Sequence, residues 1–490
     1  MHLAYGARVL AAGTIGLAVI TAAAVGTVTA AATATADGGA AAGAGLALAG
    51  RGPAAGPGSV IITPGVRHPQ READGGPSTT ADCEQSLQIA CYNPAQLQQA
   101  YGLTALYSRG VTGKGATIVV VEPYGSPTIA RDLRAFDRAE SVPRPPSLRI
   151  IRPAGKVPHF NPGNASMLSW AGETTLDVEY AHAVAPGAKI LLVETPGGGT
   201  GGTVSLSQIL TAEKYVIRHH LGDVISQSFG VAEQAVGSTA IRSLRGAYTA
   251  AYASHVTMLA ASGDTGVTGF KPSQRSYYTH RVTSWPASDP LVTAVGGTRL
   301  HLDAGGSRDS ADTVWNDTYS HTANQLVNGN NGPNPLGTGG GKSVVFTRPS
   351  YQGKVAAITG GHRGVPDISM SAACSGAVNT YQSFAGQPAG WYAVCGTSES
   401  SPLFAGVVAL ADQVAGHRLG LINPALYRLA AQRAPGLVAI RSGNNTVSFR
   451  QGGRKHTVRG FSVRAGYNLA TGLGTINAEL FVPELARAAR

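Results

Sequence analysis

The feature that most constrains the fold is an alternation of short apolar runs with helix-like segments along the chain. Ala116–Val121 is a continuous apolar run, as expected of a strand buried on both faces of a sheet. A helix-like segment over 129–140 follows it, and the pattern then repeats. The further predicted segments are helices over about 173–185, 204–219 and 238–253, and strands over 189–194, 224–228 and 255–261. The alternation predicts an α/β fold with a mainly parallel sheet, flanked by helices and joined by right-handed crossovers.

The chain of 490 residues divides by composition into three predicted parts. The apolar stretch Val9–Val28 and the small-residue motif Ala34–Ala36 predict an export signal over 1–36, and hence a secreted, extracellular protein. A membrane anchor is the alternative, since the apolar stretch is long enough to span a bilayer. Residues 37–91 are rich in Gly, Ala, Pro and Thr and predict a disordered leader. Residues 92–490 contain no internal repeat and predict a single domain.

Charge and cysteine content limit the possible partners. The formal net charge is +11, but lysine and arginine are scattered singly, which favours a solvated basic surface over a nucleic-acid footprint. We therefore expect no nucleic-acid partner, and we expect a monomer. The four cysteines fit an oxidising compartment, and two local disulfides, Cys83–Cys91 and Cys374–Cys395, are the most economical pairing. Free buried thiols are the alternative.

Three acidic residues are candidates for chemistry. Glu173 and Asp177 are four apart and share one face of a predicted helix. If that face is buried, one carboxyl must be protonated or both must be hydrogen-bonded, and a carboxyl pair that shares a proton supports general-base chemistry at low pH. The alternative is an exposed acidic face near the helix N-terminus. Asp264 follows a predicted strand at the sheet edge where sites of α/β folds gather, or else forms a local Asx-turn.

A hydroxyl candidate lies near the C-terminus. The turn Gly396-Thr397-Ser398 leads into the apolar run Leu403–Leu410, which predicts a buried helix. A serine at a helix N-terminus lies among free backbone N–H groups, where negative charge developing on a substrate carbonyl is stabilised. The alternative is a plain N-cap serine.

Together these pieces resemble the sedolisins, the serine-carboxyl peptidases whose fold is like that of subtilisin. The resemblance covers most of 92–475, and each motif is weak alone, but their number and order are specific. Besides Glu173 and Asp177, the matching motifs are Ala185–Ala188, Val224–Gly230, Ser262–Gly266, Trp285–Ser288, Val295–Thr298, Val314–Asn316, Gly339–Gly341, Val365–Asp367, Gly396–Ser398 and Asn423–Tyr427.

The resemblance implies a role for each candidate. Ser398 is the expected nucleophile, Glu173 its general base, and Asp177 a hydrogen-bonding partner that tunes Glu173. A protonated Asp264 is expected to join the Ser398 backbone N–H in the oxyanion hole. The implied function is that of a serine-type endopeptidase that hydrolyses proteins or peptides in acid, where a carboxylate still accepts protons and imidazole does not. Glu122 either extends this carboxyl network or is a solvated turn residue.

Three departures from the family pattern carry expectations of their own. Ala439 and Asn468 stand where the family has calcium-binding aspartates, with Arg441 alongside, so we expect no tight calcium site and a loop held by hydrogen bonds. No other cofactor is expected. The leader looks too short for the family's long folded propeptide, so we expect control by another route or folding without that propeptide. Phe229 stands where some relatives have tryptophan.

Rival interpretations stay open at this point. A non-catalytic secreted relative that acts as a binding or scaffold protein is the main alternative, and a Ser-His-Asp hydrolase is a distant one. The stretch Gly337–Ser343 resembles a phosphate-binding loop, but Leu336 stands where that motif needs glycine. His219-His220 is expected to be a solvated pair, and the zinc-protease motif H-E-x-x-H does not occur.

Overall fold

The computed structural model describes residues 63–64, 75–197, 203–329 and 332–489. The chain divides into two compact units, Met1–Ala44 and Gly45–Arg490, and every described residue belongs to the second unit. The predicted export signal over 1–36 and most of the predicted leader lie outside the described residues.

The secondary structure confirms an α/β fold. The helices are α1 Thr80–Ser86, α2 Pro94–Ala100, α3 Thr104–Tyr107, α4 Ile129–Ala139, α5 Ala165–Val184, α6 Thr203–Arg218, α7 Glu233–Val236, α8 Ser238–Leu244, α9 Gly246–Ala253, α10 His321–Asn328, the 3₁₀ helix η1 Ser350–Val355, α11 Ala356–Thr359, α12 Thr397–Ala415, α13 Asn423–Gln432 and α14 Ala478–Ala488. The strands are β1 Thr63–Pro64, β2 Cys91–Tyr92, β3 Thr117–Pro123, β4 Leu148–Ile151, β5 Lys189–Thr195, β6 Val224–Gln227, β7 Phe229–Ala232, β8 Thr257–Ala261, β9 Ser284–Trp285, β10 Thr293–Arg299, β11 Thr313–Val314, β12 Gly341–Thr347, β13 His362–Val365, β14 Ile368–Ser371, β15 Ala377–Gln382, β16 Gly390–Val394, β17 Leu437–Val438, β18 Val447–Gln451, β19 Arg454–Val458 and β20 Thr475–Ile476.

The main sheet follows the order β11-β10-β8-β6-β3-β5-β4, and β14 also pairs with β10. Its pairings are parallel except for β11, which is antiparallel to β10, so seven strands form the predicted parallel sheet. Parallel strands are connected through helices that cover both faces, which explains the continuous apolar runs seen in the sequence.

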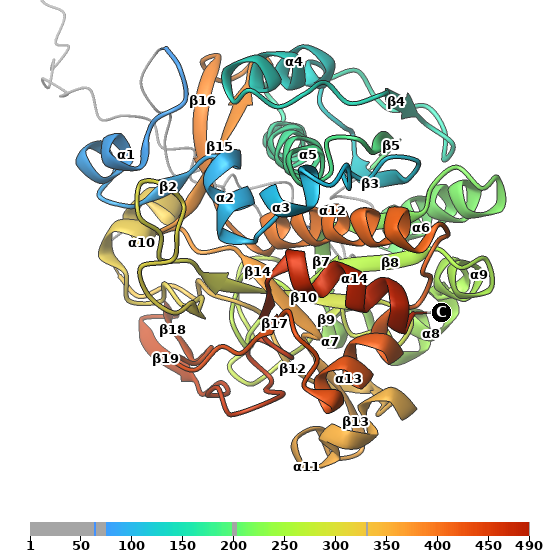
Figure 1. Ribbon diagram of the computed structural model, residues 1–490. Helices are drawn as coiled ribbons and strands as arrows, with labels where there is room; N and C mark the ends of the chain where they lie inside the picture. Colours follow the sequence, from blue (N-terminus) through green and yellow to red (C-terminus); the bar gives the residue numbers. More distant parts are fainter. Residues whose placement is uncertain (1–62, 65–74, 198–202, 330–331, 490) are drawn as a thin grey trace, which may run out of the picture. The chain divides into compact units, whose positions relative to one another are not determined.

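Side chains on successive residues of the strands enter two different cores. Ile118 and Val120 of β3 pack with residues of α5 and α12, whereas Val119 and Val121 pack with residues of α6 and α9. Figure 1 shows α5 and α12 running side by side near the middle of the sheet. The alternation is the period-2 pattern of a strand buried on both faces.

The folded region begins before Tyr92, so the predicted disordered leader over 37–91 is wrong for its last part. The segment 75–91 contains α1, capped by the Thr79 side chain, and β2, which pairs in parallel with β15. Cys83 and Cys91 form one disulfide and Cys374 and Cys395 the other, as the spacing predicts. Both disulfides lie in one apolar cluster, so the local bridge anchors 83–91 to the rest of the domain.

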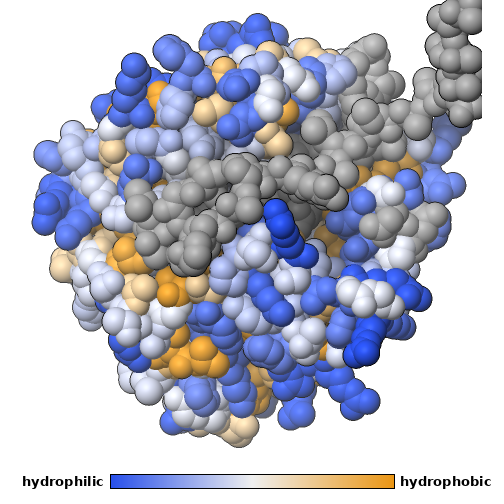
Figure 2. All heavy atoms as spheres, turned by 180° about the vertical axis from the view of Figure 1, so that it is seen from behind, coloured by the Kyte–Doolittle hydropathy of each residue, from blue (hydrophilic) through white to orange (hydrophobic). Residues whose placement is uncertain are grey.

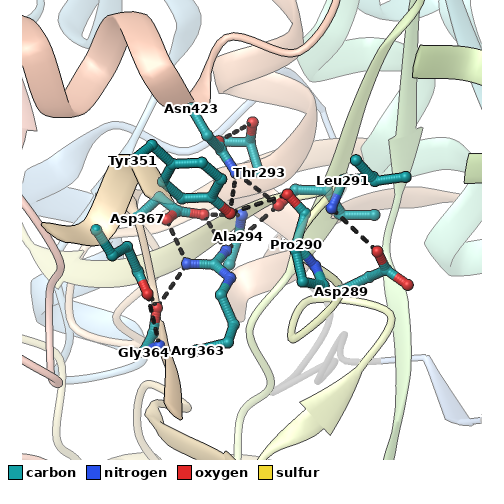
Figure 3. Close-up of polar contacts among 12 residues, drawn as sticks. Asp289, Pro290, Leu291, Thr293, Ala294, Tyr351, Arg363, Gly364, Asp367 and Asn423 are labelled. Atoms are coloured by element: carbon teal, nitrogen blue, oxygen red, sulfur yellow. Dashed lines mark hydrogen bonds and ion pairs between the residues drawn. The ribbon is translucent and has the colours of Figure 1, made fainter. Parts of the chain in front are cut away.

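A buried ion pair fixes the start of β14 against β10 (Figure 3). Both nitrogens of the Arg363 guanidinium fork donate to the Asp367 carboxylate, at 2.6 and 2.5 Å, and both side chains are fully buried. Asp367 also accepts hydrogen bonds from the Ala294 backbone N–H at 2.8 Å and from the Tyr427 hydroxyl at 2.9 Å. Each carboxylate oxygen therefore has two donors, which is the condition for a buried charge to be tolerated.

The face shown in Figure 2 is mostly hydrophilic, with apolar residues in small separate groups. The large apolar or aromatic side chains that are exposed among the described residues are Ile150, Tyr215, Tyr252, Tyr319, Val344, Val414, Val438 and Leu480. Singly exposed residues of this kind are normal for a protein surface. The expected monomeric state stays a prediction.

Candidate active site

Glu173 and Asp177 lie in the interior, on a helix that is buried along most of its length. Both have a relative exposure of 0%, so the alternative of an exposed acidic face is wrong. The helix α5 starts at Ala165, where the Asn164 side chain accepts hydrogen bonds from two backbone N–H groups, so the two acids lie well inside it. Charge at this depth is expensive, and hydrogen bonds or shared protons are required.

Ser398 is the second residue of α12. The N-cap is Gly396, whose φ of 136° favours glycine, and no side-chain bond caps the helix, so the plain N-cap interpretation is wrong. Ser398 is fully buried, and its Oγ has no hydrogen-bond partner within the described part of the chain. Its carbonyl accepts a hydrogen bond from Ser228 Oγ at 3.3 Å. The hydroxyl is therefore unused by the fold, and it lies in the first helical turn, where backbone N–H groups are free.

Asp264 is held next to the nucleophile candidate. Its Oδ1 accepts hydrogen bonds from the Thr397 backbone N–H and the Thr397 hydroxyl, each at 2.7 Å. Thr397 Oγ1 in turn accepts from the Gly263 backbone N–H at 3.0 Å. Thr397 and Asp264 are 133 residues apart in the sequence. Asp264 therefore connects the turn after β8 to the start of α12 and does not form only a local turn.

A path of neighbouring buried polar groups connects the acids to the Ser398 segment. Asp177 lies close enough to Ser228 and Glu122 for both to shift its pKa, and the Ser228 hydroxyl donates to the Ser398 carbonyl at 3.3 Å. Glu122 is fully buried at the end of β3, and its interactions include both Glu173 and Asp177. The alternative of a solvated turn residue is wrong for Glu122. The path joins three parts of the fold, since Glu122 lies near the end of β3, Ser228 lies between β6 and β7, and Asp177 lies on α5.

Burial controls the protonation of this path. Desolvation raises the pKa of Asp177 to about 8, and the neighbouring Ser228 and Glu122 partly oppose the rise. Desolvation, followed by the proximity of Asp177 and Glu173, raises the pKa of Glu122 well above its usual range. Both carboxyls are therefore protonated in acidic solution, where each offers an O–H donor to a neighbour.

The edge of β7 next to this cluster pairs with another segment. Thr63 pairs with Gly230 and Pro64 with Phe229 in an antiparallel register, and β9 pairs with the other edge of β7. β7 directly follows Ser228, whose hydroxyl donates to the Ser398 carbonyl. Strand addition to an open sheet edge is a common way to bind an extended peptide.

The segments expected to replace a calcium site are held by hydrogen bonds. Asn468 Oδ1 accepts from the backbone N–H groups of Ala470 and Thr471, at 3.0 and 2.8 Å. Neither Ala439 nor Asn468 provides a carboxylate, so the residues present do not fit a calcium ion. Within the described ranges there is no group of three His, Cys, Asp or Glu side chains that could hold a metal ion. In the same ranges, the helices are too short or too polar to cross a bilayer.

Reasoning from the sequence missed the bridging residues. Ser228 links Asp177 to the Ser398 segment, and Thr397 links Asp264 to it, yet neither was singled out as a site residue. The signal for Ser228 was its place at the end of a predicted strand, at the same sheet edge as Asp264. The signal for Thr397 was its place next to Ser398 in the Gly-Thr-Ser turn.

Comparison with known proteins gives a consistent set of relatives. A model of the subtilase family matches residues 163–452. Kumamolisin from Bacillus sp. (strain MN-32) is 31% identical over 407 residues, covering 80% of this chain and 63% of the relative. Sedolisin from Pseudomonas sp. (strain 101) is 28% identical over 396 residues, covering 79% of this chain and 60% of the relative. The chain thus spans less than two thirds of the length of these relatives. A solved structure of Pseudomonas sedolisin, complexed with two molecules of pseudo-iodotyrostatin, matches with a TM-score of 0.65 at 25% identity, over 82% of this chain and all of that chain.

Proposed function

Because the chain belongs to the subtilase family and is a homologue of the sedolisins, we propose that it is an acid-acting endopeptidase that uses Ser398 as its nucleophile. The observation that carries the proposal is the buried path from Glu122 through Asp177 and Ser228 to the Ser398 segment. No requirement of the fold explains burying three carboxyls together, since buried like charges destabilise a structure unless protons are shared.

The proposed reaction uses three of the four predicted residues directly, namely Ser398, Glu173 and Asp264. Ser398 Oγ attacks the scissile carbonyl carbon while Glu173 takes the hydroxyl proton, and the carbonyl electrons move onto oxygen. The protonated carboxyl of Asp264 and the Ser398 backbone N–H donate hydrogen bonds to that oxyanion. Collapse of the intermediate expels the amine, which takes the proton from Glu173 and leaves an acyl-enzyme. A water molecule then repeats the two steps and releases the acid product.

The protonation of the site favours acidic solution. Asp177 and Glu122 keep their protons in acid because burial raises the pKa of each. A protonated Asp177 can donate a hydrogen bond within the carboxyl cluster, which leaves Glu173 as the member that accepts the serine proton. As the pH rises toward the pKa of about 8 of Asp177, further negative charge would enter a site without water to solvate it.

The pairing along β7 supports cleavage inside a chain. Thr63 and Pro64 are internal residues of the sequence, and they pair with β7, which begins directly after Ser228. An edge that admits an internal stretch suits an endopeptidase better than an enzyme that requires a free amino terminus. The two disulfides support the proposed extracellular location, where such bonds persist.

The test is turnover of unfolded casein between pH 3 and pH 8 by the full chain and three variants. Ser398→Ala and Glu173→Gln are expected to lose activity by about 10³-fold or more while retaining the wild-type circular dichroism spectrum. Glu213→Gln is the matched control, because Glu213 is equally buried but lies on α6, outside the site. Full activity in Glu173→Gln, or a plateau at pH 7–8 with no activity in acid, contradicts the proposal. An acetylated peptide substrate separates internal cleavage from release of tripeptides at a free amino terminus.

A further inference from the structure

The hairpin formed by β18 and β19 carries an unbalanced positive charge. Between 413 and 478 the sequence contains nine lysine or arginine residues and no aspartate or glutamate. On the hairpin and just after it, Arg450, Arg454, Lys455 and Arg459 are all exposed. We call Arg450 and Lys455, which pair across the strands on one face, together with the exposed Arg459 that follows β19, the basic hairpin face. Arg454 at the turn lies on the other face. Within the described ranges none of the four makes an ion pair.

The strand register places like charges opposite each other. Arg450 of β18 pairs directly with Lys455 of β19, and the neighbouring pair is Gln451 with Arg454. Like charges directly opposite in an antiparallel pair destabilise a sheet. The hairpin tolerates this repulsion because Phe449 and Val458 anchor its other face in a small apolar cluster. Folding does not require the charges, so they are available for a partner.

The positive charge continues onto the neighbouring loop. The sequence between 265 and 288 also lacks acidic residues and contributes Lys271, Arg275 and Arg281. Arg281 Nε donates to the Arg459 carbonyl at 2.6 Å, and its guanidinium lies 4.6 Å from the centre of the Phe461 ring. The Tyr277 backbone N–H donates to Gln451 Oε1 at 2.6 Å, so the loop is bound to the hairpin.

An exposed aromatic ring lies beside these cations. Tyr319 has the highest relative exposure, 66%, of the large apolar and aromatic residues that are exposed in the described ranges. Its position is fixed, since its hydroxyl and Ser448 Oγ are 2.7 Å apart and the Lys455 ammonium lies 5.5 Å from the ring centre. Ser448 Oγ is also 2.7 Å from Thr457 Oγ1 on the partner strand. A rigid ring between cations offers contact area at a small entropy cost.

We propose that the basic hairpin face and Tyr319 bind an acidic glycan, a polysaccharide that carries sulfate or phosphate esters. The ester anions meet Arg450, Lys455 and their neighbours, and a sugar ring packs against the exposed part of Tyr319. The preference for esters over carboxylates rests on the proposed activity in acid, where carboxylates lose their charge and these esters keep it. The site contains no residue of the proposed catalytic machinery, so bound glycan would hold the enzyme at a glycan-bearing surface without contacting the proposed catalytic residues.

The geometry favours a glycan over a nucleic acid. Single-stranded nucleic acids are held by successive aromatic platforms along a basic groove. Tyr319 is the single large aromatic residue among the exposed ones that lies at this hairpin, since Tyr215 and Tyr252 belong to α6 and α9. One ring with several cations matches one sugar between charged neighbours better than a stack of bases.

The test measures binding of heparin, as a sulfated glycan, and of a phosphomannan, as a phosphate-bearing glycan, by the full chain. All proteins carry Ser398→Ala, which prevents self-digestion, and binding is measured at pH 4 and pH 7 in about 0.1 M salt. The double variant Arg450→Gln/Lys455→Gln is compared with Arg138→Gln/Arg149→Gln, which removes the same charge from α4 and β4. Figure 1 places these two elements at the top of the molecule, far from the hairpin.

We expect the hairpin double variant to bind at least one of the two polymers about tenfold more weakly or worse, and the control variant to bind like the parent. Tyr319→Ala is expected to weaken binding with no change in charge, whereas Tyr319→Phe keeps the ring and retains most of it. If both double variants bind equally weakly, the effect comes from net charge alone and the proposal is wrong. The proposal is also wrong if the parent binds neither polymer. Equally tight binding of oligo(dT), lost in the hairpin variant, would assign the face to nucleic acid instead. These readouts do not depend on peptidase activity, so failure of the proposed function leaves them interpretable.

Discussion

Glu213 can be used to test whether a fully buried carboxyl makes the stability of this protein depend on pH. It lies on α6, which packs against α9, and its relative exposure is 0%. Neither of its carboxyl oxygens has a hydrogen-bond partner within the described part of the chain. Burial raises the pKa of Glu213 well above the usual value of 4.5, and no opposing interaction accompanies it. The side chain is therefore neutral in the folded protein over a wide pH range.

The sign and size of the effect follow from proton linkage. Below pH 4.5 the carboxyl is protonated in both the folded and unfolded states, and its contribution to stability is fully present. Above that pH the unfolded chain releases the proton and the folded chain retains it. The free energy of unfolding then falls by about 1.4 kcal/mol per pH unit until the folded-state pKa is reached. Between pH 5 and pH 7 this one residue is expected to remove about 2.7 kcal/mol of stability.

Glu213→Gln removes the titration and nearly preserves the shape of the side chain. Parent and variant both carry Ser398→Ala. At pH 4.5 their free energies of unfolding, measured in urea, should differ by less than about 1 kcal/mol. At pH 7 the variant should be more stable than the parent by about 2–3 kcal/mol. Glu84→Gln, at an exposed position on α1, is the matched control and should change neither value. Parallel profiles for Glu213→Gln and its parent would show that Glu213 ionises inside the folded protein, which would refute the argument.

Three further measurements test other parts of the structure. Asp367→Asn should lower the free energy of unfolding by about 3–5 kcal/mol, because it leaves the fully buried Arg363 without its counter-charge, and a loss below 1 kcal/mol would contradict this. Replacing Cys374 and Cys395 by alanine should cost about 3 kcal/mol in urea unfolding, since the bridge closes a loop with a sequence separation of 21, and an unchanged midpoint would count against it. A strong calcium chelator should leave the melting temperature nearly unchanged, as measured by calorimetry, whereas a large decrease would show that a calcium site survives.

The elements of the central sheet could be predicted closely because their signal is local. The strand predicted over 189–194 is Lys189–Thr195, and the helix predicted over 204–219 is Thr203–Arg218. The start of α5 was missed by eight residues, since the helix begins at Ala165 and the prediction began at 173. A helix buried along most of its length has no polar face, so periodicity cannot mark where it begins. The capping residue Asn164 was the available signal.

One helix prediction also merged two elements. The segment predicted as a helix over 238–253 consists of α8, which ends at Leu244, and α9, which begins at Gly246. Arg245 lies between them and forms an ion pair with the buried Asp289, at 2.6 Å. The break depends on a partner 44 residues away, which no local pattern reveals, although glycine at 246 is a weak sign of a boundary.

For the site, the sequence could supply the residue types but not the connections between them. Spacing alone put Glu173 and Asp177 on one helix face, yet it could not distinguish an exposed acidic face from a buried one. The decision depends on what covers α5, which is α12, more than 200 residues further along. For Glu122, too, the sequence could not show whether the side chain is buried, and its two interpretations differ only in that respect. Tertiary packing therefore decides which carboxyls become chemically unusual, because desolvation is the largest cause of their raised pKa values.

The site and the scaffold respond to pH through the same physical cause. Burial also raises the pKa values of Glu179 on α5 and of Glu399, the residue after Ser398 on α12, well above the usual range for carboxyls. Each such group favours the folded state in acid and opposes it as the pH rises, by the linkage worked out for Glu213. A fold with several of these groups loses stability as the pH rises, which is compatible with the proposed activity in acid. Glu213→Gln and Glu179→Gln are expected to extend stability toward neutral pH. If they leave the pH profile of turnover unchanged, the pH dependence of stability and the pH dependence of turnover have separate causes. The proposed preference of turnover for acidic solution would then arise from the cluster of Glu122, Asp177 and Glu173 alone.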